Sequence, residues 1–286
     1  MTITNQDLLL FINILKSSSS YDFSEYSDKS LKRRLAKVLI DHKLDLNGLL
    51  IQLKSNPTFL EQVVKDITVN TTELFRDPNI WQILKHNVLP KFKNQQNINI
   101  WHAGCSTGQE VYSMLMLLNE LNLFDKTKVY GTDINNDVLQ IAKRGTYKYR
   151  FNINYLDNFD KAIKENPYNY EALQDIPYEK YFTIDKAKDT IKMNQFLLDK
   201  PVFKKHDLVK DGNIFYVKFD LILCRNVIIY FNYELQNKVF ELFYNNLYPN
   251  AYQLLGMHES ILGPYSSRFD KMGHFYQKKE NFNYMP

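Results

Sequence analysis

Apolar residues recur every three or four positions in the first part of the chain. The four stripes run over residues 8–15, 31–40, 46–53 and 59–67. This spacing puts the apolar side chains of a helix on one face. Ser19, Ser20 and the Asn56-Pro57 pair interrupt the stripes, as residues in turns do. The pattern therefore predicts a small helical bundle.

The pattern changes after about residue 95, where short β-rich runs alternate with helical runs. The strand candidates are residues 98–101, 128–131, 221–224 and 252–256, and the helical candidates are residues 110–122, 136–144 and 233–247. Such alternation is typical of a mostly parallel sheet with helices on both faces. It stops between about 146 and 200, where residues 181–199 look like a small antiparallel hairpin.

The composition favours a well-packed globular protein. Of the 286 residues, 44% are hydrophobic and 14% aromatic, and the formal net charge is +4. So small an excess does not indicate nucleic-acid binding, and no apolar run approaches the roughly 18 residues of a membrane span. The N-terminus lacks the basic region and cleavage site of a signal peptide. We expect a cytoplasmic protein with no membrane insertion and no nucleic-acid partner.

The stretch WHAGCSTGQE, residues 101–110, joins a predicted strand to a predicted helix. Its two glycines, Gly104 and Gly108, let the backbone turn tightly and come close to a ligand. Asp133 ends the next predicted strand, where a carboxylate accepts hydrogen bonds from ribose hydroxyls in nucleotide-binding sheets. The phosphate-binding patterns G-x-G-x-x-G and G-K-[ST] are absent, which favours S-adenosylmethionine. A nucleotide-dependent oxidoreductase and a purely connecting turn remain alternatives.

Cysteine and histidine residues indicate no further chemistry. Cys105 and Cys224 are too few for a disulfide framework and are expected to be buried and reduced. His258 and Glu259 are neighbours in the sequence, and neighbouring residues of a strand point to opposite faces of the sheet. We therefore predict no metal site.

Five motifs in this order resemble the chemotaxis receptor (CheR-type) protein-glutamate O-methyltransferases. They are NTTELFRD (70–77), WHAGCSTGQEVYS (101–113), GTDINNDVLQIAKRGTY (131–147), FDLILCRNVIIYF (219–231) and GMHESI (256–261). DFSEYSDKSLKRRL (22–35) is similar to the N-terminal helical signature of that family, and FKKHDL (203–208) to its strand after the insert. The resemblance extends from about residue 20 to residue 276.

The resemblance implies an α/β fold, in which a Rossmann-like class I methyltransferase sheet carries a small β-subdomain insert and follows an N-terminal α-helical bundle domain. The expected boundaries are residues 1–75 for the helical domain, 76–95 for a linker, 96–286 for the S-adenosylmethionine-dependent methyltransferase domain and about 178–200 for the insert.

The resemblance also implies a site for S-adenosyl-L-methionine, with S-adenosyl-L-homocysteine as product. Arg76 and Tyr230 are expected at the reacting groups, and the family pattern leaves open whether Arg76 pairs with the carboxylate of the cofactor or of the substrate. The expected cofactor-binding residues are Asn70, Thr72, Arg76, Ala103, Gly104, Gln109, Asp133, Asp207, Leu208, Asn226 and Val227.

The partner implied by the resemblance is a chemoreceptor. Residues 28–43 form a basic helix, and its residues Lys29, Arg33, Arg34 and Lys37 are expected to dock the acidic methylation helices of the receptor. In some members of the family the edge of the β-subdomain also binds a C-terminal receptor peptide by strand addition.

The expected reaction is methyl transfer to glutamate side-chain carboxylates of chemoreceptors, which forms glutamate 5-O-methyl esters in chemotaxis adaptation. A glutamate with an ordinary pKa of about 4.3 is already ionised near neutral pH, so no general base is needed. Two alternatives remain at this point. One is an S-adenosylmethionine-binding sensor or regulatory protein of the same fold, and the other is a methyltransferase for another substrate.

Overall fold

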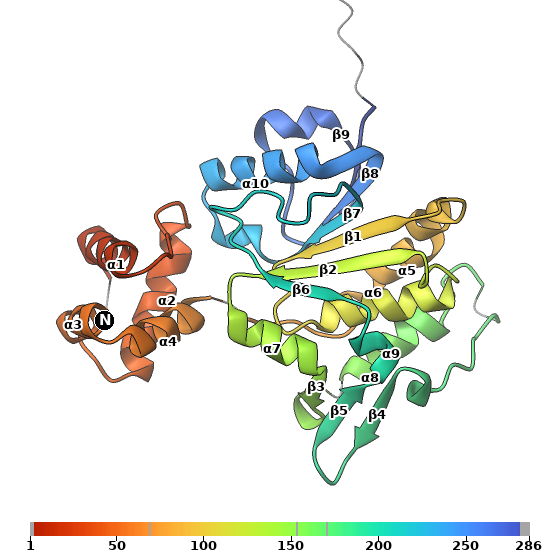
Figure 1. Cartoon of the computed structure of the whole chain (residues 1–286), viewed down its shortest axis with the longest axis horizontal. Coiled ribbons are helices and arrows are strands. Elements are labelled where there is room, and N and C mark those ends of the chain that lie inside the picture. The colour runs from red at the N-terminus through yellow and green to blue at the C-terminus, as the bar shows by residue number, and fades with distance from the viewer. Residues whose placement is uncertain (1–2, 69, 153, 170, 281–286) are drawn as a thin grey trace, which may run out of the picture.

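The computed structural model describes residues 3–68, 70–152, 154–169 and 171–280. A bundle of helices lies beside a larger α/β body, as Figure 1 shows. Within the described residues, no helix has both the length and the apolar character needed to cross a bilayer.

The bundle comprises α1 (Asn5–Ser18), α2 (Asp28–Asp41), α3 (Leu46–Ser55) and α4 (Pro57–Ile67). Local signals set where these helices begin: a Thr4–Asp7 capping box precedes α1, Asp45 caps α3, and Asn56 caps α4 ahead of Pro57. The apolar stripes face one another in a shared core, which confirms the helical interpretation of this region. Its buried residues include Phe11, Leu35, Leu49 and Val63.

The α/β body is built on one seven-stranded sheet with the order β6-β2-β1-β7-β8-β10-β9. The strands are β1 (Ile98–Ala103), β2 (Thr127–Asp133), β6 (Val202–Lys205), β7 (Phe219–Cys224), β8 (Leu247–Leu255), β9 (Phe269–Met272) and β10 (Phe275–Lys278). β6, β2, β1, β7 and β8 are mutually parallel, and β10 is antiparallel to both of its neighbours. The predicted mostly parallel sheet is therefore confirmed.

Helices cover both faces of this sheet. The main ones are α5 (Pro78–Ile83), α6 (Gln109–Glu120), α7 (Asn136–Arg144) and α10 (Tyr233–Asn246). The apolar residues of α6 pack in one core cluster with Ile100 and Leu221, whereas those of α10 pack in another with Trp101 and Ile222. Because neighbouring residues of a strand face opposite ways, α6 and α10 lie on opposite faces, as Figure 1 also shows.

Shorter elements complete the chain between these helices and strands. They are β3 (Thr146–Lys148), α8 (Asn154–Phe159), β4 (Phe182–Asp185), β5 (Thr190–Met193), α9 (Gln195–Leu198), and helical turns at Leu84–Val88, Leu89–Phe92, Arg150–Asn152, Asp160–Lys164, Tyr178–Lys180, Ile228–Tyr230 and Gly263–Arg268.

The strand order reverses between β1 and β7, because the chain goes from β1 outward to β2 and β6 and then returns to β7 on the other side. In open α/β sheets, ligands bind beyond the carboxyl ends of the strands at such a point. The loops that follow β1, β2, β6 and β7 all meet there.

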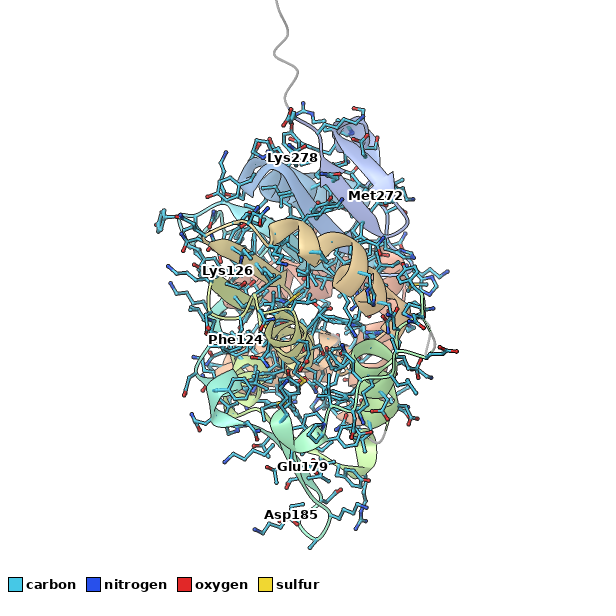
Figure 2. All side chains as sticks on the ribbon, turned by 90° about the vertical axis from the view of Figure 1, so that its right-hand side faces the viewer. Phe124, Lys126, Glu179, Asp185, Met272 and Lys278 are labelled. Atoms are coloured by element: carbon cyan, nitrogen blue, oxygen red, sulfur yellow. The ribbon has the colours of Figure 1, made fainter. Side chains whose placement is uncertain are left out.

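The insert forms its own sheet with the order β3-β5-β4. The predicted hairpin corresponds to β4 and β5, but β3 adds a third strand that the sequence interpretation missed, because three residues are too short a run to show alternation. In Figure 2, Asp185 at the tip of this β-subdomain and Met272 of β9 lie toward opposite ends of the molecule.

The helical bundle is attached to the carboxyl end of the sheet through the segment that precedes α2. Ser27 N donates to the Tyr230 carbonyl at 2.8 Å, and Asn232 N donates to the Glu25 carbonyl at 2.9 Å. The Tyr26 ring packs edge-on against Phe231 with a centroid distance of 5.0 Å. These contacts position α2 over the switch point of the sheet.

Candidate functional site

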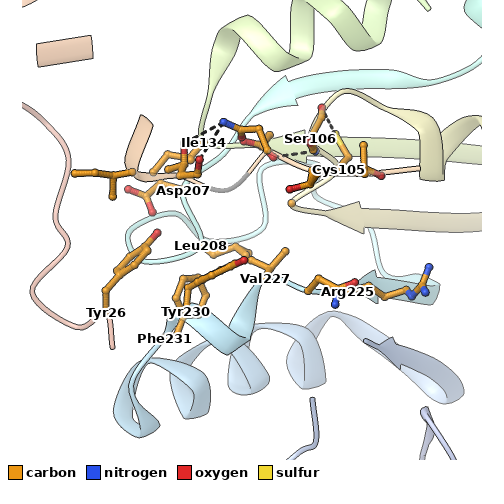
Figure 3. Close-up of a pocket in the computed structure, with 18 of the residues that line it drawn as sticks. Tyr26, Cys105, Ser106, Ile134, Asp207, Leu208, Arg225, Val227, Tyr230 and Phe231 are labelled. Carbon is orange, nitrogen blue, oxygen red and sulfur yellow. Dashed lines mark hydrogen bonds between the residues drawn. The ribbon is translucent and has the colours of Figure 1, made fainter. Parts of the chain in front are cut away.

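A cavity that is partly open to solvent lies between the helical bundle and the carboxyl ends of the strands. Figure 3 shows Cys105, Ser106 and Asp207 on one side of it and Val227, Tyr230 and Phe231 on the other. Three parts of the chain build its walls: α2 and the end of α4, the segment 70–76, and the loops after β1, β2, β6 and β7.

The turn after β1 keeps one wall of the cavity open to a ligand. Gly104 has φ +78°, and a Cβ built on it would lie 2.5 Å from Val227 Cγ2, so no larger residue fits there without movement. The amide nitrogens of Gly104 and Cys105 both donate to the Thr132 carbonyl at 2.8 Å, which fixes the turn against β2. The backbone of this turn is therefore both close to the cavity and rigidly held.

Asp133 lies at the carboxyl end of β2 and faces the cavity. Its Oδ2 accepts a hydrogen bond from Ser106 N and its Oδ1 from Asn135 N, each at 2.9 Å. Burial raises the pKa of Asp133, although these backbone donors oppose the shift. Each carboxylate oxygen has a second lone-pair site, so the oriented side chain can still accept hydrogen bonds from a ligand.

A buried ion network lies at the inner end of the cavity. The Arg225 guanidinium is almost fully buried; Nη1 lies 3.0 Å from Glu110 Oε2 and Nη2 lies 2.7 Å from Asp77 Oδ2. Nη2 also donates to the Arg76 carbonyl at 3.1 Å, and His102 Nδ1 lies 2.8 Å from Glu110 Oε1. Burial opposes ionisation of Glu110, but the His102 hydrogen bond and the Arg225 charge lower its pKa. The network joins β1, α6, β7 and the segment before α5.

A second buried carboxylate shapes the loop after β7. Glu259 Oε2 accepts from the backbone N–H groups of Gly256 and Asn226 at 2.7 and 2.8 Å, and Oε1 accepts from Val227 and Ile229 at 2.9 and 3.3 Å. Asn226 has φ +60°, a conformation that non-glycine residues rarely adopt. Burial raises the pKa of Glu259, and the backbone donors oppose that shift. Glu259 thus holds Asn226 and Val227 at the cavity, and it is buried whereas its neighbour His258 is exposed.

The loop after β6 forms another wall. Asp207 and Leu208 line the cavity, and Asp207 Oδ1 accepts a hydrogen bond from Val209 N at 2.9 Å. Burial raises the pKa of Asp207. The buried His206 precedes them, and its Nε2 lies 2.8 Å from the Gly212 carbonyl oxygen. This loop therefore has a fixed shape before any ligand binds.

The structure brings together all but two of the residues expected at the site. Those at the cavity are Asn70, Thr72, Arg76, Gly104, Asp133, Asp207, Leu208, Asn226, Val227 and Tyr230. Ala103 is buried in β1 and does not line the cavity. Gln109 is buried and does not line the cavity; its Nε2 donates to Tyr155 Oη at 2.9 Å and its Oε1 accepts from Thr107 Oγ1 at 2.6 Å.

Glu110 lines the cavity in the place expected for Gln109, since one residue along a helix turns the side chain by about 100°. The helix itself begins at Gln109 after a glycine N-cap, Gly108 with φ +89°. Sequence reasoning also missed Arg225 and Tyr26. For Glu110 the sequence offered a signal, because its position along the helix determines which face of α6 it lies on. Arg225 and Tyr26 reach the cavity through tertiary packing, which the sequence does not show.

The four basic residues expected on the docking face of α2 divide into two groups. Lys29, Arg33 and Lys37 are exposed, and we call them the basic stripe. Arg34 differs from the expectation, because it lies on the side of α2 that lines the cavity, and its Nε is buried without a hydrogen-bond partner among the described residues. Residues four apart share a helix face, so Arg34 lies in line with Ser30, which also lines the cavity.

The expected buried state of both cysteines is confirmed. Cys105 and Cys224 are free and buried, and burial raises the pKa of each thiol well above its ordinary value. A thiol with a raised pKa is a poor nucleophile at neutral pH.

The residues at the cavity fit S-adenosylmethionine. The open Gly104 turn, the oriented carboxylate of Asp133 at a strand end and the ionised Glu110 provide a close backbone approach and two acceptors for hydroxyl and ammonium groups. With the seven-stranded sheet, this site defines a class I S-adenosylmethionine-dependent methyltransferase. Residues 70–276 match the CheR methyltransferase, SAM binding domain, and residues 6–68 match the CheR methyltransferase, all-alpha domain. The chain belongs to the CheR methyltransferase family.

Relatives of similar length support this membership. The methyltransferase Cher3 of Pseudomonas putida is 33% identical over 94% of this chain and 94% of its own length. The chemotaxis protein methyltransferase of Borreliella burgdorferi is 30% identical, over 92% of this chain and 91% of its own. Among solved structures, PKMT2 of Rickettsia typhi in complex with AdoHcy is similar to 66% of this chain and covers 26% of its own, with 15% identity and a TM-score of 0.35.

We predict that Arg225→Met destabilises the protein strongly, because Glu110 and Asp77 would lose their shared cation in a buried place. Breaking a buried ion pair lowers the free energy of unfolding by about 3–5 kcal/mol, which urea titration measures. Glu110→Gln in the same chain should restore part of the loss. The control is Lys238→Met, which removes an exposed ion pair with Glu25 and should change stability by less than about 1 kcal/mol. Equal effects of the two substitutions would contradict the role of Arg225.

A second prediction concerns acid stability. The pKa of Glu110 is lower in the folded protein than its ordinary value of 4.5, so the unfolded chain takes up this proton first as the pH falls. Glu110 therefore stabilises the fold fully above its unfolded pKa, and this contribution disappears as the pH falls through the lowered folded pKa. Glu110→Gln should make stability less steeply dependent on pH below 4.5, as measured by urea titrations across that range. A slope identical to that of the wild type would refute the prediction.

Proposed function

We propose that this protein transfers the methyl group of S-adenosylmethionine to glutamate side chains of chemoreceptors and forms glutamate 5-O-methyl esters. The observation that carries the proposal is a cavity of methyltransferase type that also holds arginine side chains, Arg34 and Arg76, next to the Asp133 and Glu110 carboxylates. Family membership supports the chemotactic setting, and relatives are named chemotaxis protein methyltransferases.

In this proposal Asp133 accepts hydrogen bonds from the ribose hydroxyls, and Glu110 pairs with the ammonium group of the cofactor. Asp207 and Leu208 flank the adenine, whereas Asn226, Val227 and Gly104 face the methionine part. Asn70 and Thr72 close the cavity from the segment that joins the bundle to the sheet. Because the Glu110 carboxylate is kept ionised by His102 and Arg225, it attracts an ammonium group at any pH near neutrality.

When bound, S-adenosylmethionine supplies an electrophilic methyl group on a positively charged sulfur. A glutamate acceptor is ionised near neutral pH, so the site needs no base to remove a proton. Arg76 has no side-chain hydrogen bond or ion pair with any residue that the structure describes, and it lines the cavity. Its guanidinium is therefore free to bind a carboxylate in a bidentate manner and to orient the attacking oxygen.

The walls of the cavity also exclude water. Tyr26 and Phe231 pack together where the bundle meets the sheet, and Tyr230 lies beside them at the cavity. A drier site weakens the hydration of separated charges and so favours a transition state in which sulfonium and carboxylate charges are partly neutralised. We assign Tyr230 to the wall that confines the acceptor carboxylate.

The basic stripe of α2 provides a docking surface for acidic substrate helices in this proposal. Lys29, Arg33 and Lys37 are exposed on the helix that carries Arg34 into the cavity. Opposite charge accelerates association and makes it sensitive to salt. The outer strands of the β-subdomain, β3 and β4, are open edges for a receptor C-terminal peptide.

The test of the proposed function is transfer of labelled methyl groups to chemoreceptor-containing membranes. We expect label that mild alkali releases as volatile methanol, because methyl esters hydrolyse readily whereas N-methyl groups do not. Asp133→Ala should abolish transfer and weaken S-adenosylhomocysteine binding in calorimetry. Asp125→Ala, at an exposed residue before the opposite end of β2, serves as the control. Alkali-stable label would refute ester formation, and cofactor binding without any transfer would favour a sensor.

A further prediction concerns the basic stripe. The variant Lys29→Glu with Arg33→Glu should raise KM for receptor membranes and reduce the salt dependence of methylation, while the Kd for S-adenosylhomocysteine stays unchanged. Arg34 is left intact because it lines the cavity, so that its substitution would change cofactor or acceptor binding as well as docking. Lys54→Glu on α3 is the matched control outside the stripe. If the methylation rate of the wild type depends on salt no more than that of the variant, docking by charge is contradicted.

A further inference from the structure

An exposed apolar surface flanks the mouth of the cavity. It consists of Ile229, Tyr233, Met257 and Leu262, whose exposed fractions are 38%, 52%, 47% and 54%. We call it the rim patch. Single exposed apolar residues are common on proteins, whereas several on adjoining loops indicate a contact surface.

Local contacts bring the members of the rim patch together in two pairs, Ile229 with Met257 and Tyr233 with Leu262. Glu259 accepts a hydrogen bond from Ile229 N and donates its own N–H to the Gly256 carbonyl at 3.1 Å, so the loop that carries Met257 lies against the turn that carries Ile229. A Cβ built on Gly263 would lie 2.6 Å from Tyr233 Oη, which places Leu262 beside Tyr233.

The rim patch is continuous with the cavity and with the basic stripe. Ile229 precedes Tyr230, which lines the cavity, and Gly256 before Met257 packs against Asn226, whose backbone N lies 2.9 Å from a Cβ built on that glycine. On the other side, Ser27 N at the start of α2 donates to the Tyr230 carbonyl at 2.8 Å. The start of α2, the helix that carries the basic stripe, and the rim patch therefore both adjoin Tyr230 at the cavity.

This arrangement places a requirement on a protein substrate. If the acceptor is a glutamate on a helix, its short side chain reaches the cavity only when that helix lies across the mouth. A helix is about 10–12 Å wide, so residues three and four positions from the acceptor then touch the surfaces on either side of it. One side offers positive charge from α2 and the other offers apolar side chains.

We propose that the rim patch binds the apolar flank of the acceptor helix, and that the enzyme selects glutamates with acidic neighbours on one flank and apolar neighbours on the other. This inference rests on the proposed function, because it specifies the substrate of the same site. The interaction removes apolar surface from water, so it contributes affinity that salt does not weaken. The basic stripe and the rim patch then act through different forces on one helix.

The variants Met257→Gln and Leu262→Gln, which replace an apolar side chain with a polar one of no net charge, test this proposal in full-length protein with receptor membranes as substrate. Each should raise KM for the receptor by about tenfold, the factor expected when about 1.4 kcal/mol of apolar burial is lost. The slope of methylation rate against salt, the kcat and the Kd for S-adenosylhomocysteine should stay close to those of the wild type. Met257→Leu should retain a normal KM, because it keeps the apolar surface.

The matched control is Ile51→Gln, at an exposed apolar residue on α3 with 66% of its surface accessible. It should leave KM unchanged, and thermal unfolding of all variants verifies that they are folded. If the wild type methylates receptors and the rim variants have a normal KM, the inference is overturned while the proposed function stands. If the wild type does not methylate receptors at all, both are overturned.

Discussion

The site depends on one buried cation. Arg225 lies at the end of β7, where the strand order of the sheet reverses, and it pairs with Glu110 of α6 and with Asp77 before α5. Burial of a guanidinium is costly unless carboxylates balance its charge. The segments that supply those partners must therefore stay together, which holds the linker from the helical bundle against the sheet.

The same ion pair also maintains a negative charge at the cavity. Glu110 stays ionised although it is buried, because His102 and Arg225 both stabilise its negative charge. Glu259 acts in a comparable way on the neighbouring loop, where backbone N–H groups surround its carboxylate and hold Asn226 in a rare conformation. Both carboxylates are oriented before a ligand arrives, so ligand binding loses little conformational entropy in ordering these side chains.

One helix of the bundle contributes both to the cavity and to the outer surface. α2 presents Arg34 to the cavity and the basic stripe to solvent, because successive residues of a helix differ by about 100° in direction. An exposed basic surface and a charged part of the cavity wall thus come from a single helix. The contacts of Ser27 and Tyr26 with the loop after β7 hold this helix against the sheet.

Local patterns in the sequence were enough to determine the helical bundle, the parallel strands, the Gly104 turn and the strand-end position of Asp133. Periodicity and glycine placement act over a few residues, so they can be interpreted without tertiary structure. Only packing decided three other features. Glu110 rather than Gln109 lines the cavity, Arg34 lies on the side of α2 that faces the cavity, and Arg225 pairs with Asp77. Those contacts join residues up to 148 positions apart, and their energy comes from burial that no short segment reveals.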